Sequence, residues 1–178
     1  MSEKLEKLKI KNAQKRLLER FCFLNIEEII NSNDEKGEKF FAEFRNSGIW
    51  NYENKAIASF PFHNNGLIDK DLYHSQHKKA QALFVEKIKA LSNDFVWITL
   101  SENDIYFFVK ISLSTLCKYL DTWFEEYPDF EVFIPNQYAL ALHDAEYEWE
   151  VLEKILNQKN QHTEYEQFTP RSHRNWQK

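Results

Sequence analysis

Glycine is scarce in this chain of 178 residues, which has only three, at Gly37, Gly48 and Gly66. Glycine-rich phosphate-binding loops need several glycines close together, because backbone N–H groups must approach the anion closely. The three glycines are too widely spaced to form such a loop. The sequence therefore argues against P-loop, Rossmann-type and kinase-type nucleotide sites, and we expect no cofactor.

Cysteine and long apolar runs are also scarce. The two cysteines, Cys22 and Cys117, lie far apart in apolar contexts, whereas a secreted domain of this kind more often carries a dense, even set. The first residues lead into a charged amphipathic stretch and not into the apolar region of a signal peptide. No apolar run approaches the roughly 20 residues that span a bilayer. We therefore expect a cytoplasmic protein with no membrane partner.

Aromatic residues, in contrast, are abundant: fifteen Phe, eight Tyr and five Trp make up 16% of the chain. Each can bury roughly 150–250 Å², so the sequence holds enough apolar surface for a core without a metal or disulfides. The length lies within the usual range of one domain. We predict a single α+β domain over residues 1–158 and a polar, loosely ordered C-terminal tail over residues 159–178.

The N-terminal half has mainly helical periodicity. Apolar residues recur every three or four positions, which predicts three helices, over residues 2–31, 35–46 and 69–91. Asn25 with Glu28 resembles a capping box, which allows the first stretch to divide into two helices. Residues 56–60 fit a strand that Pro61 restricts to a sheet edge, and a turn is expected at residues 63–66.

The C-terminal half alternates between strands and a helix. β-rich runs predict four strands, at residues 94–100, 105–111, 130–134 and 138–143. Ser112 or Ser114 caps a helix that ends before Pro128. Residues 146–151 alternate as a half-buried strand does, but residues 146–158 also fit a helix, which we favour. The expected fold class is α+β: an antiparallel sheet of four to six strands with helices packed on it and a mainly helical N-terminal half.

The net charge of −5 conceals a gradient along the chain. Residues 1–20 carry a net +4, whereas residues 101–166, with four basic and fourteen acidic residues, carry a net −10. A domain whose second half is this acidic repels nucleic acid and attracts basic surfaces. We therefore expect no nucleic-acid partner and favour a basic protein as the partner.

Two groups of polar residues have the composition of chemical sites. Asp71, His74 and His77 lie at intervals of three on a predicted helix, and two His one turn apart can hold a transition metal. No third ligand is identifiable, so a solvated helix face is the simpler interpretation. His143 follows a strand and has Asp144 beside it, which suits a general base. No nucleophile motif accompanies it, so we expect neither a metal site nor an enzyme.

The basic stretch from Lys4 to Arg20 raises another alternative, a nucleic-acid-binding module. Its acidic residues, Glu3, Glu6 and Glu19, are interleaved with the basic ones, as on the outside of an ordinary amphipathic helix. A heavily acidic domain follows it. An exposed helix face is therefore the preferred interpretation.

Acidic residues of the C-terminal half form two groups that lie close to aromatic residues. Acidic residues beside exposed aromatics are typical of an interface with a basic partner, in which aromatic anchors provide affinity and charge accelerates association. Solubilising surface charge is the simpler explanation of the same pattern. The residues that we predict to bind a protein partner are Glu125, Glu126, Asp129, Glu131, Asp144, Glu146, Tyr147, Glu148, Trp149 and Glu150.

Residues 94–156 run as strand, strand, helix, strand and strand, and contain the strings Phe130–Ile134 and Tyr138–Asp144. This order and these strings resemble the C-terminal part of bacterial immunity proteins from polymorphic-toxin and contact-dependent growth inhibition systems. The resemblance implies a cytoplasmic protein that binds a cognate toxin domain, often a nuclease, and blocks its active site. The acidic balance fits a basic nuclease, because carboxylates mimic the charge of nucleic acid. Two alternatives stay open: a small hydrolase that uses His143 with nearby carboxylates, and a nucleic-acid-binding regulatory module.

Overall fold

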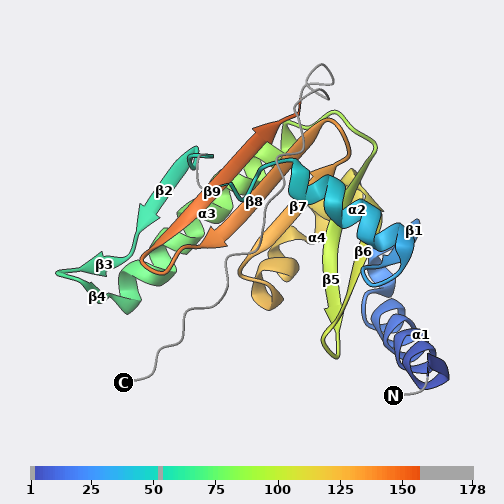
Figure 1. Cartoon of the computed structure of the whole chain (residues 1–178). Coiled ribbons are helices and arrows are strands. Elements are labelled where there is room, and N and C mark those ends of the chain that lie inside the picture. The colour runs from blue at the N-terminus through green and yellow to red at the C-terminus, as the bar shows by residue number, and fades with distance from the viewer. Residues whose placement is uncertain (1–2, 52–53, 157–178) are drawn as a thin grey trace, which may run out of the picture.

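A seven-stranded antiparallel sheet forms the centre of the molecule, and helices pack on both of its faces (Figure 1). The computed structural model describes residues 3–51 and 54–156. The α+β class expected from the sequence is confirmed, and the predicted tail, residues 159–178, lies outside the described residues. The elements of the described part are α1 (Glu3–Arg20), η1 (Cys22–Leu24), β1 (Glu28–Asn31), α2 (Glu35–Asn46), β2 (Ala58–Pro61), β3 (His63–Asn64), β4 (Leu67–Ile68), α3 (Lys70–Lys89), β5 (Phe95–Glu102), β6 (Ile105–Ser112), α4 (Leu113–Glu126), β7 (Phe130–Ile134), β8 (Tyr138–Asp144) and β9 (Glu148–Ile155).

The strands of the large sheet lie in the order β1-β6-β5-β7-β8-β9-β2, and every neighbouring pair is antiparallel. β5 and β6 form the predicted hairpin, whose turn residues Asn103 and Asp104 have positive φ angles of 52° and 60°. Asn and Asp tolerate this conformation better than most side chains. β7, β8 and β9 follow as a meander. The five central strands therefore all come from residues 95–155, and the N-terminal half supplies only the two edges.

Three helices cover one face of the sheet. α1, α3 and α4 pack their apolar sides against alternate residues of strands β5 to β9, and the buried side chains form one continuous cluster. This arrangement follows from strand geometry, because every second side chain points to the same face. Large, fully buried members of this main core include Phe84, Phe107, Leu116, Leu140 and Trp149.

The opposite face of the sheet carries a single helix within the described residues. α2 crosses this face in Figure 1. The ring of Phe40 lies 4.6 Å from that of Trp97, and the ring of Phe44 lies 5.1 Å from that of Phe133. α2 has only twelve residues, which corresponds to about 18 Å at 1.5 Å per residue. It therefore covers only part of this second face.

Side-chain caps fix where three helices begin. Asp34, Asp69 and Ser112 each accept hydrogen bonds from backbone N–H groups in the first turn of α2, α3 and α4. The predicted helices over residues 35–46, 69–91 and 112–127 are confirmed, as are the four strands predicted in the C-terminal half. In residues 3–51 and 54–156, no helix combines the length and the apolar character needed to cross a bilayer.

The prediction of helix over residues 2–31 is wrong beyond Arg20. α1 ends there, a 3₁₀ turn follows, and Asn25 adopts a left-handed conformation, with φ of 48°, that does not continue a helix. The next residues form β1, which pairs along its whole length with β6. Its β-branched Ile29 and Ile30 suit a strand. The break expected at Asn25 is therefore present, but it leads into a strand.

The preference for a helix over residues 146–158 is also wrong. Most of this stretch is β9, which lies between β8 and β2. The strict alternation in the sequence was the decisive signal: Trp149 and Val151 are buried in the main core, and Glu148 and Glu150 therefore point to the second face. Together, β1 and β9 raise the number of strands above the four to six expected.

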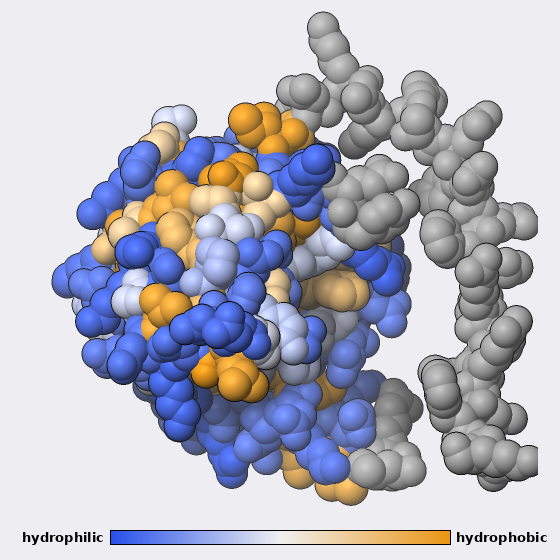
Figure 2. All heavy atoms as spheres, turned by 90° about the vertical axis from the view of Figure 1, so that its left-hand side faces the viewer, coloured by the Kyte–Doolittle hydropathy of each residue, from blue (hydrophilic) through white to orange (hydrophobic). Residues whose placement is uncertain are grey.

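The predicted edge strand is confirmed. Among the described strands, β2 pairs only with β9, and it ends at Pro61, where a missing N–H does no harm on an edge. The predicted turn lies in the ribbon of β3 and β4, where Asn65 and Gly66 have positive φ angles. This ribbon projects from the sheet and exposes Leu67 and Ile68. Figure 2, viewed onto this end, shows apolar patches separated by hydrophilic surface.

Gly37 allows α2 to lie directly against the segment that follows β1. A Cβ at this position would come 1.8 Å from the carbonyl oxygen of Asn31 and 2.8 Å from the Cα of Ser32. Alanine stabilises a helix by about 1 kcal/mol relative to glycine. Here, however, the added Cβ would clash with backbone atoms of Asn31 and Ser32 and force α2 away from them. We therefore expect Gly37→Ala to lower the free energy of unfolding by about 2–3 kcal/mol, as measured by urea titration.

Gly66→Ala is the matched control, because nothing lies within 4 Å of the added Cβ and only the positive φ of 79° opposes the substitution. It should cost about 1 kcal/mol. Equal effects of the two substitutions would contradict the close approach of α2 to the backbone beside β1.

Candidate functional site

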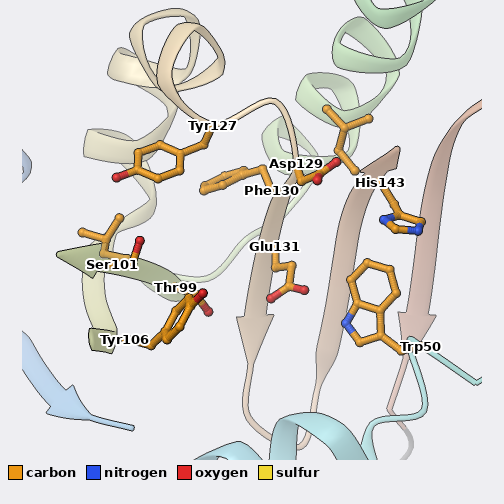
Figure 3. A pocket seen from close by; sticks show the side chains of 11 residues that line it. Trp50, Thr99, Ser101, Tyr106, Tyr127, Asp129, Phe130, Glu131 and His143 are labelled. Atoms are coloured by element: carbon orange, nitrogen blue, oxygen red, sulfur yellow. The ribbon is translucent and has the colours of Figure 1, made fainter. Parts of the chain in front are cut away.

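A pocket of about 390 Å³ opens on the part of the second sheet face that α2 leaves uncovered (Figure 3). It lies beside the first residue of β7, where the two neighbouring strands, β5 and β8, extend beyond the start of β7. The segment that leads from α4 into β7 borders one side of the pocket, and the segment after α2 borders the opposite side. The lining residues are Trp50, Thr99, Leu100, Ser101, Tyr106, Tyr127, Asp129, Phe130, Glu131, Leu142 and His143.

Strand alternation determines which side chains face the pocket. On β7, both neighbours of Glu131 are buried in the main core, so Glu131 points to the second face. The same rule places Thr99 and Ser101 of β5 and His143 of β8 on that face. Tyr106 of β6 lies directly opposite Ser101 in the register. Polar and aromatic residues at alternate positions of four strands thus form one surface.

Glu131 provides the carboxylate at the centre of the pocket (Figure 3). Burial raises the pKa of its carboxyl to about 7; a hydrogen bond from the indole N–H of Trp50 opposes this increase, and the negative charge of Asp129 adds to it. None of the ion pairs in the described part of the chain includes Glu131 or Asp129. Near neutral pH, the pocket therefore contains a carboxylate that is partly protonated and has no basic partner among the described residues.

Trp50 lies between Glu131 and His143. Its ring is perpendicular to the imidazole of His143, with 5.0 Å between the ring centroids, and its side chain is 42% exposed. A turn at the end of α2 positions it, because Gly48 takes a φ of +73° and the adjacent Ile49 is buried in the smaller core cluster. Ile49 thus anchors this segment to the sheet, and Trp50 lies over the pocket.

The aromatic residues of the pocket were not predicted from the sequence. Tyr106 offered a signal, because it occupies a position of an alternating strand that faces away from the main core. Tyr127 was identified only as the end of a helix. Trp50 offered no signal, since its place depends on how α2 packs across strands that come much later in the chain.

A second group of polar residues lies where β7, β8 and α3 meet. The hydroxyl of Tyr73 donates a hydrogen bond to Asp144 Oδ2 at 3.2 Å, and the backbone N–H of Asp144 donates to Asp129 Oδ1 at 2.8 Å. Burial and the charge of Asp144 raise the pKa of Tyr73, and burial lowers the pKa of the neighbouring His77. Asp144, a predicted partner-binding residue, therefore connects β8 to α3.

Four of the predicted partner-binding residues lie on the second sheet face. Asp129 and Glu131 line the pocket. Glu150 lies opposite His143 in the register of β8 and β9, and Glu148 is two residues earlier on the same strand. The structure therefore brings together carboxylates that are separated by about twenty positions in the sequence.

The other predicted acidic residues are more scattered. Glu146 and Tyr147 are exposed in the turn between β8 and β9, where Glu146 has a positive φ of 60°. Glu125 is exposed near the end of α4. Glu126 is the last residue of that helix, and its side chain lies outside the described residues. Glu125 and Glu146 therefore carry exposed negative charge outside the pocket.

The prediction of Trp149 as an exposed anchor for a partner is wrong. Its side chain is 0% exposed and belongs to the main core. The imidazole of His77 stacks on its ring with 3.9 Å between centroids and 17° between planes, and Tyr73 packs against it at 5.2 Å. The reason is the strand register, which turns Trp149 toward α3 and the acidic residues on either side of it toward the second face.

The possible metal ligands on α3 differ in their exposure. Asp71 and His74 are exposed, as a solvated helix face requires, whereas His77 is half-buried against Trp149. His77 Nε2 lies 3.4 Å from the carbonyl oxygen of Pro128. Within residues 3–51 and 54–156, no group of three or more His, Cys, Asp or Glu has an arrangement that would hold a metal ion.

The basic N-terminal helix is amphipathic. Ala13 and Leu17 of α1 are buried in the main core, and Lys15 pairs with Glu19 at 3.7 Å on the exposed side. Such an exposed pair at i and i+4 contributes little to stability. The basic residues of α1 thus include solvated ones on the outside of a packed helix.

No protein-family model, no curated protein and no solved structure matches this chain. The geometry of the pocket and of the acidic residues around it is therefore the basis for a functional proposal. The resemblance to immunity proteins stays a prediction from the sequence.

Burial of Trp149 predicts a stability effect that an exposed anchor would not have. We expect Trp149→Ala to lower the free energy of unfolding by about 3–5 kcal/mol, since the ring fills the space between His77 and Tyr73. The indole N–H has no hydrogen-bond partner among the described residues, so Trp149→Phe should cost much less. Urea unfolding of both variants measures the difference. A loss below about 1 kcal/mol for the alanine variant would place Trp149 on the surface.

Glu131 predicts a pH dependence of stability. Its pKa is raised in the folded state, so the folded protein binds the proton more tightly than the unfolded chain does, and the stability contribution falls as pH rises from about 4.5 to about 7. We expect Glu131→Gln, which keeps an acceptor for Trp50, to be more stable than the parent at pH 8 by on the order of 2–3 kcal/mol.

The gain from Glu131→Gln should disappear near pH 5, as measured by urea unfolding at both pH values. Glu125→Gln, on an exposed helical position, is the control and should change stability equally at pH 5 and pH 8. A pH-independent effect of Glu131→Gln would mean that Glu131 ionises as an ordinary surface carboxyl.

Proposed function

We propose that this chain is an inhibitor of the immunity-protein kind, which acts in the cytoplasm by binding a cognate toxin domain, a basic nuclease, and blocking its active site. The observation that carries the proposal is the second sheet face, where unpaired carboxylates lie among exposed aromatic rings. We call this surface the acidic face and define it by Trp50, Tyr106, Asp129, Glu131, Glu148 and Glu150, with Glu146 in the adjoining turn.

Some carboxylates of the described residues form ion pairs, whereas those of the acidic face do not. Elsewhere, Glu28 pairs with Lys36, and Glu153 pairs with Lys87 at 2.7 Å. Within the described residues, no ion pair includes any carboxylate of the acidic face. Unpaired negative charge on one face raises the local potential, and this attracts and orients a positively charged partner.

The exposed aromatic residues support a protein partner. Trp50 is 42% exposed, Tyr106 is 55% exposed, and Tyr147, in the turn beside β9, is 43% exposed. Trp and Tyr are enriched among the residues that dominate binding energy at protein interfaces. A surface that combines such rings with carboxylates suits a nuclease, whose own substrate site is basic and recognises phosphates and bases.

A hydrolase that uses His143 is the second candidate, because His143 shares the pocket with two hydroxyl groups, those of Thr99 and Ser101. A nucleophile and its general base lie within hydrogen-bond reach in most such sites. No hydrogen bond joins His143 to either hydroxyl in the described part of the chain, and its ring packs against Trp50. The inhibitor is therefore the better-supported function. Turnover of a substrate that His143→Ala abolishes without unfolding the protein would reverse this ranking.

The proposal predicts how charge affects binding to the cognate toxin domain. Replacing Glu146, Glu148 and Glu150 with Lys should slow association by about 10- to 100-fold at low salt, because the long-range attraction is lost. Raising the salt concentration should slow the parent protein as well, since the Debye length falls from roughly 10 Å at 0.1 M to about 3 Å at 1 M. Stopped-flow kinetics measure both effects.

The matched control reverses charge on α1, with Lys7, Lys11 and Lys15 replaced by Glu, and should leave association nearly unchanged or slightly faster. In cells, the parent and the control should protect against the toxin, and the triple Lys variant should protect less. Binding that is independent of salt and of the triple change would contradict an electrostatic interface. Absence of any binding would contradict the inhibitor function itself.

A further inference from the structure

We propose that the pocket receives one arginine side chain of the partner, with its guanidinium paired to Glu131 and packed against the rings of Trp50 and Tyr106. This inference rests on the proposed function and specifies which chemical group the acidic face recognises. The observations behind it are an open pocket of about 390 Å³, a carboxylate without a counter-charge among the described residues, and aromatic walls (Figure 3).

The carboxylate of Glu131 favours a cation as the occupant. Burial disfavours its charged form, and one hydrogen bond from a neutral indole does not compensate a full negative charge. Among the residues that the structure describes, no Lys or Arg lines the pocket. A cation supplied by a partner would provide the missing counter-charge, and Asp129 and the nearby Glu150 would strengthen the attraction.

The aromatic walls favour a flat, weakly hydrated cation. Trp50 and Tyr106 lie on different sides of Glu131 in Figure 3 and are both substantially exposed. A guanidinium stacks on such rings while it donates hydrogen bonds in its own plane. A lysine ammonium is more strongly hydrated and lacks the planar fork, so it gains less from the same walls.

Acceptors in the pocket match the donors of a guanidinium. Its five N–H groups need several acceptors in different directions, and the lining residues provide carboxylate oxygens from Glu131 and Asp129 and hydroxyl oxygens from Thr99 and Ser101. Asp129 uses Oδ1 to accept from the backbone of Asp144, which fixes its orientation. The volume of about 390 Å³ lies at the small end of the roughly 300–1,000 Å³ typical of ligand pockets.

The same geometry makes binding depend on pH. A guanidinium binds the ionised form of Glu131, whose pKa is about 7, so affinity should rise about tenfold between pH 6 and pH 8. The other titratable groups that face this pocket are Asp129, Tyr127, Tyr106 and His143, with Glu150 beyond His143 in the register. His143→Gln tests whether the histidine contributes to the change.

The experiment uses the full chain and a defined probe, N-acetyl-arginine methylamide, titrated into the millimolar range. The readout is the set of indole N–H signals in a ¹⁵N–¹H spectrum of the protein, which has five Trp; Trp50→Phe identifies the signal of Trp50. The citrulline analogue, which has nearly the same shape without the charge, is the matched control probe, and the lysine analogue tests the choice of cation.

We expect the arginine probe to shift the Trp50 signal saturably, the lysine probe to bind more weakly and the citrulline probe to have little effect. Glu131→Gln should weaken binding of the arginine probe by about tenfold or more and remove most of the pH dependence, and His143→Gln should preserve both. Because Glu131→Gln is expected to be at least as stable as the parent, a loss of binding does not reflect unfolding.

Equal shifts with arginine and citrulline, or unchanged binding by Glu131→Gln, would overturn the inference. The proposed function is tested separately by the toxin. If the toxin binds the acidic face but the arginine probe does not bind the pocket, this inference is wrong and the inhibitor function stands. If the probe binds and the toxin does not, the guanidinium site exists and the inhibitor function is wrong.

Discussion

The unequal covering of the two faces of one sheet determines what this molecule presents to its surroundings. Strand alternation gives each face half of the side chains, and three of the four α-helices of the described chain pack on the same half. Of the described helices, only α2 packs on the second face, together with the turn that follows it. Ile49 is buried there and Trp50 is left half-exposed, so the end of one helix becomes the border of the pocket. The polar residues of β5, β7 and β8 are accessible because no further helix of the described part of the chain covers them.

The sequence predicts the elements better than it predicts the surface that they build. Apolar periodicity located most helices and strands, and Ser112 was one of two candidate caps of α4, because these signals are local. Two stretches, β1 and β9, were assigned to helices although Ile29, Ile30 and the Glu-Trp-Glu alternation favour strands. Pairing with β6 and β8 makes these stretches strands, and these partners lie elsewhere in the chain. The residues of the candidate site also divide into those that local signals identify and those that depend on long-range packing. Asp129, Glu131 and Glu150 were identified from local composition, whereas Trp50 joins them only through long-range packing. Trp149 was assigned to the surface because its acidic neighbours suggested exposure, although alternation turns it to the other face.

A half-buried carboxylate without a counter-charge is unfavourable for folding at neutral pH. Glu131 has no such partner among the described residues, yet it lies in β7, whose other residues are apolar. An apolar residue at this position would extend the smaller core cluster of Phe44, Phe133 and Ala141. Proteins commonly tolerate such local cost at positions that bind or react. The cost supports treating the pocket as a functional surface, and it separates Glu131 from Glu153, which has both Lys87 and the hydroxyl of Tyr138 as partners.

The two edge strands also have a consequence for how the chain acquires its structure during synthesis. β1 and β2 leave the ribosome early, yet their partners lie 76 to 93 positions further along: Glu28 pairs with Lys110, and Ala58 pairs with Val151. Contacts of such long range slow folding, because a large loop must close before they form. The five central strands, in contrast, are joined by short turns and one helix. A nascent chain therefore lacks the partner of β1 until β6 has been translated, and it lacks the partner of β2 until β9 has been translated. During that interval the apolar sides of α1 and α3 lack the strands that bury them, and chaperones that hold exposed apolar segments would have their longest opportunity to act on this protein.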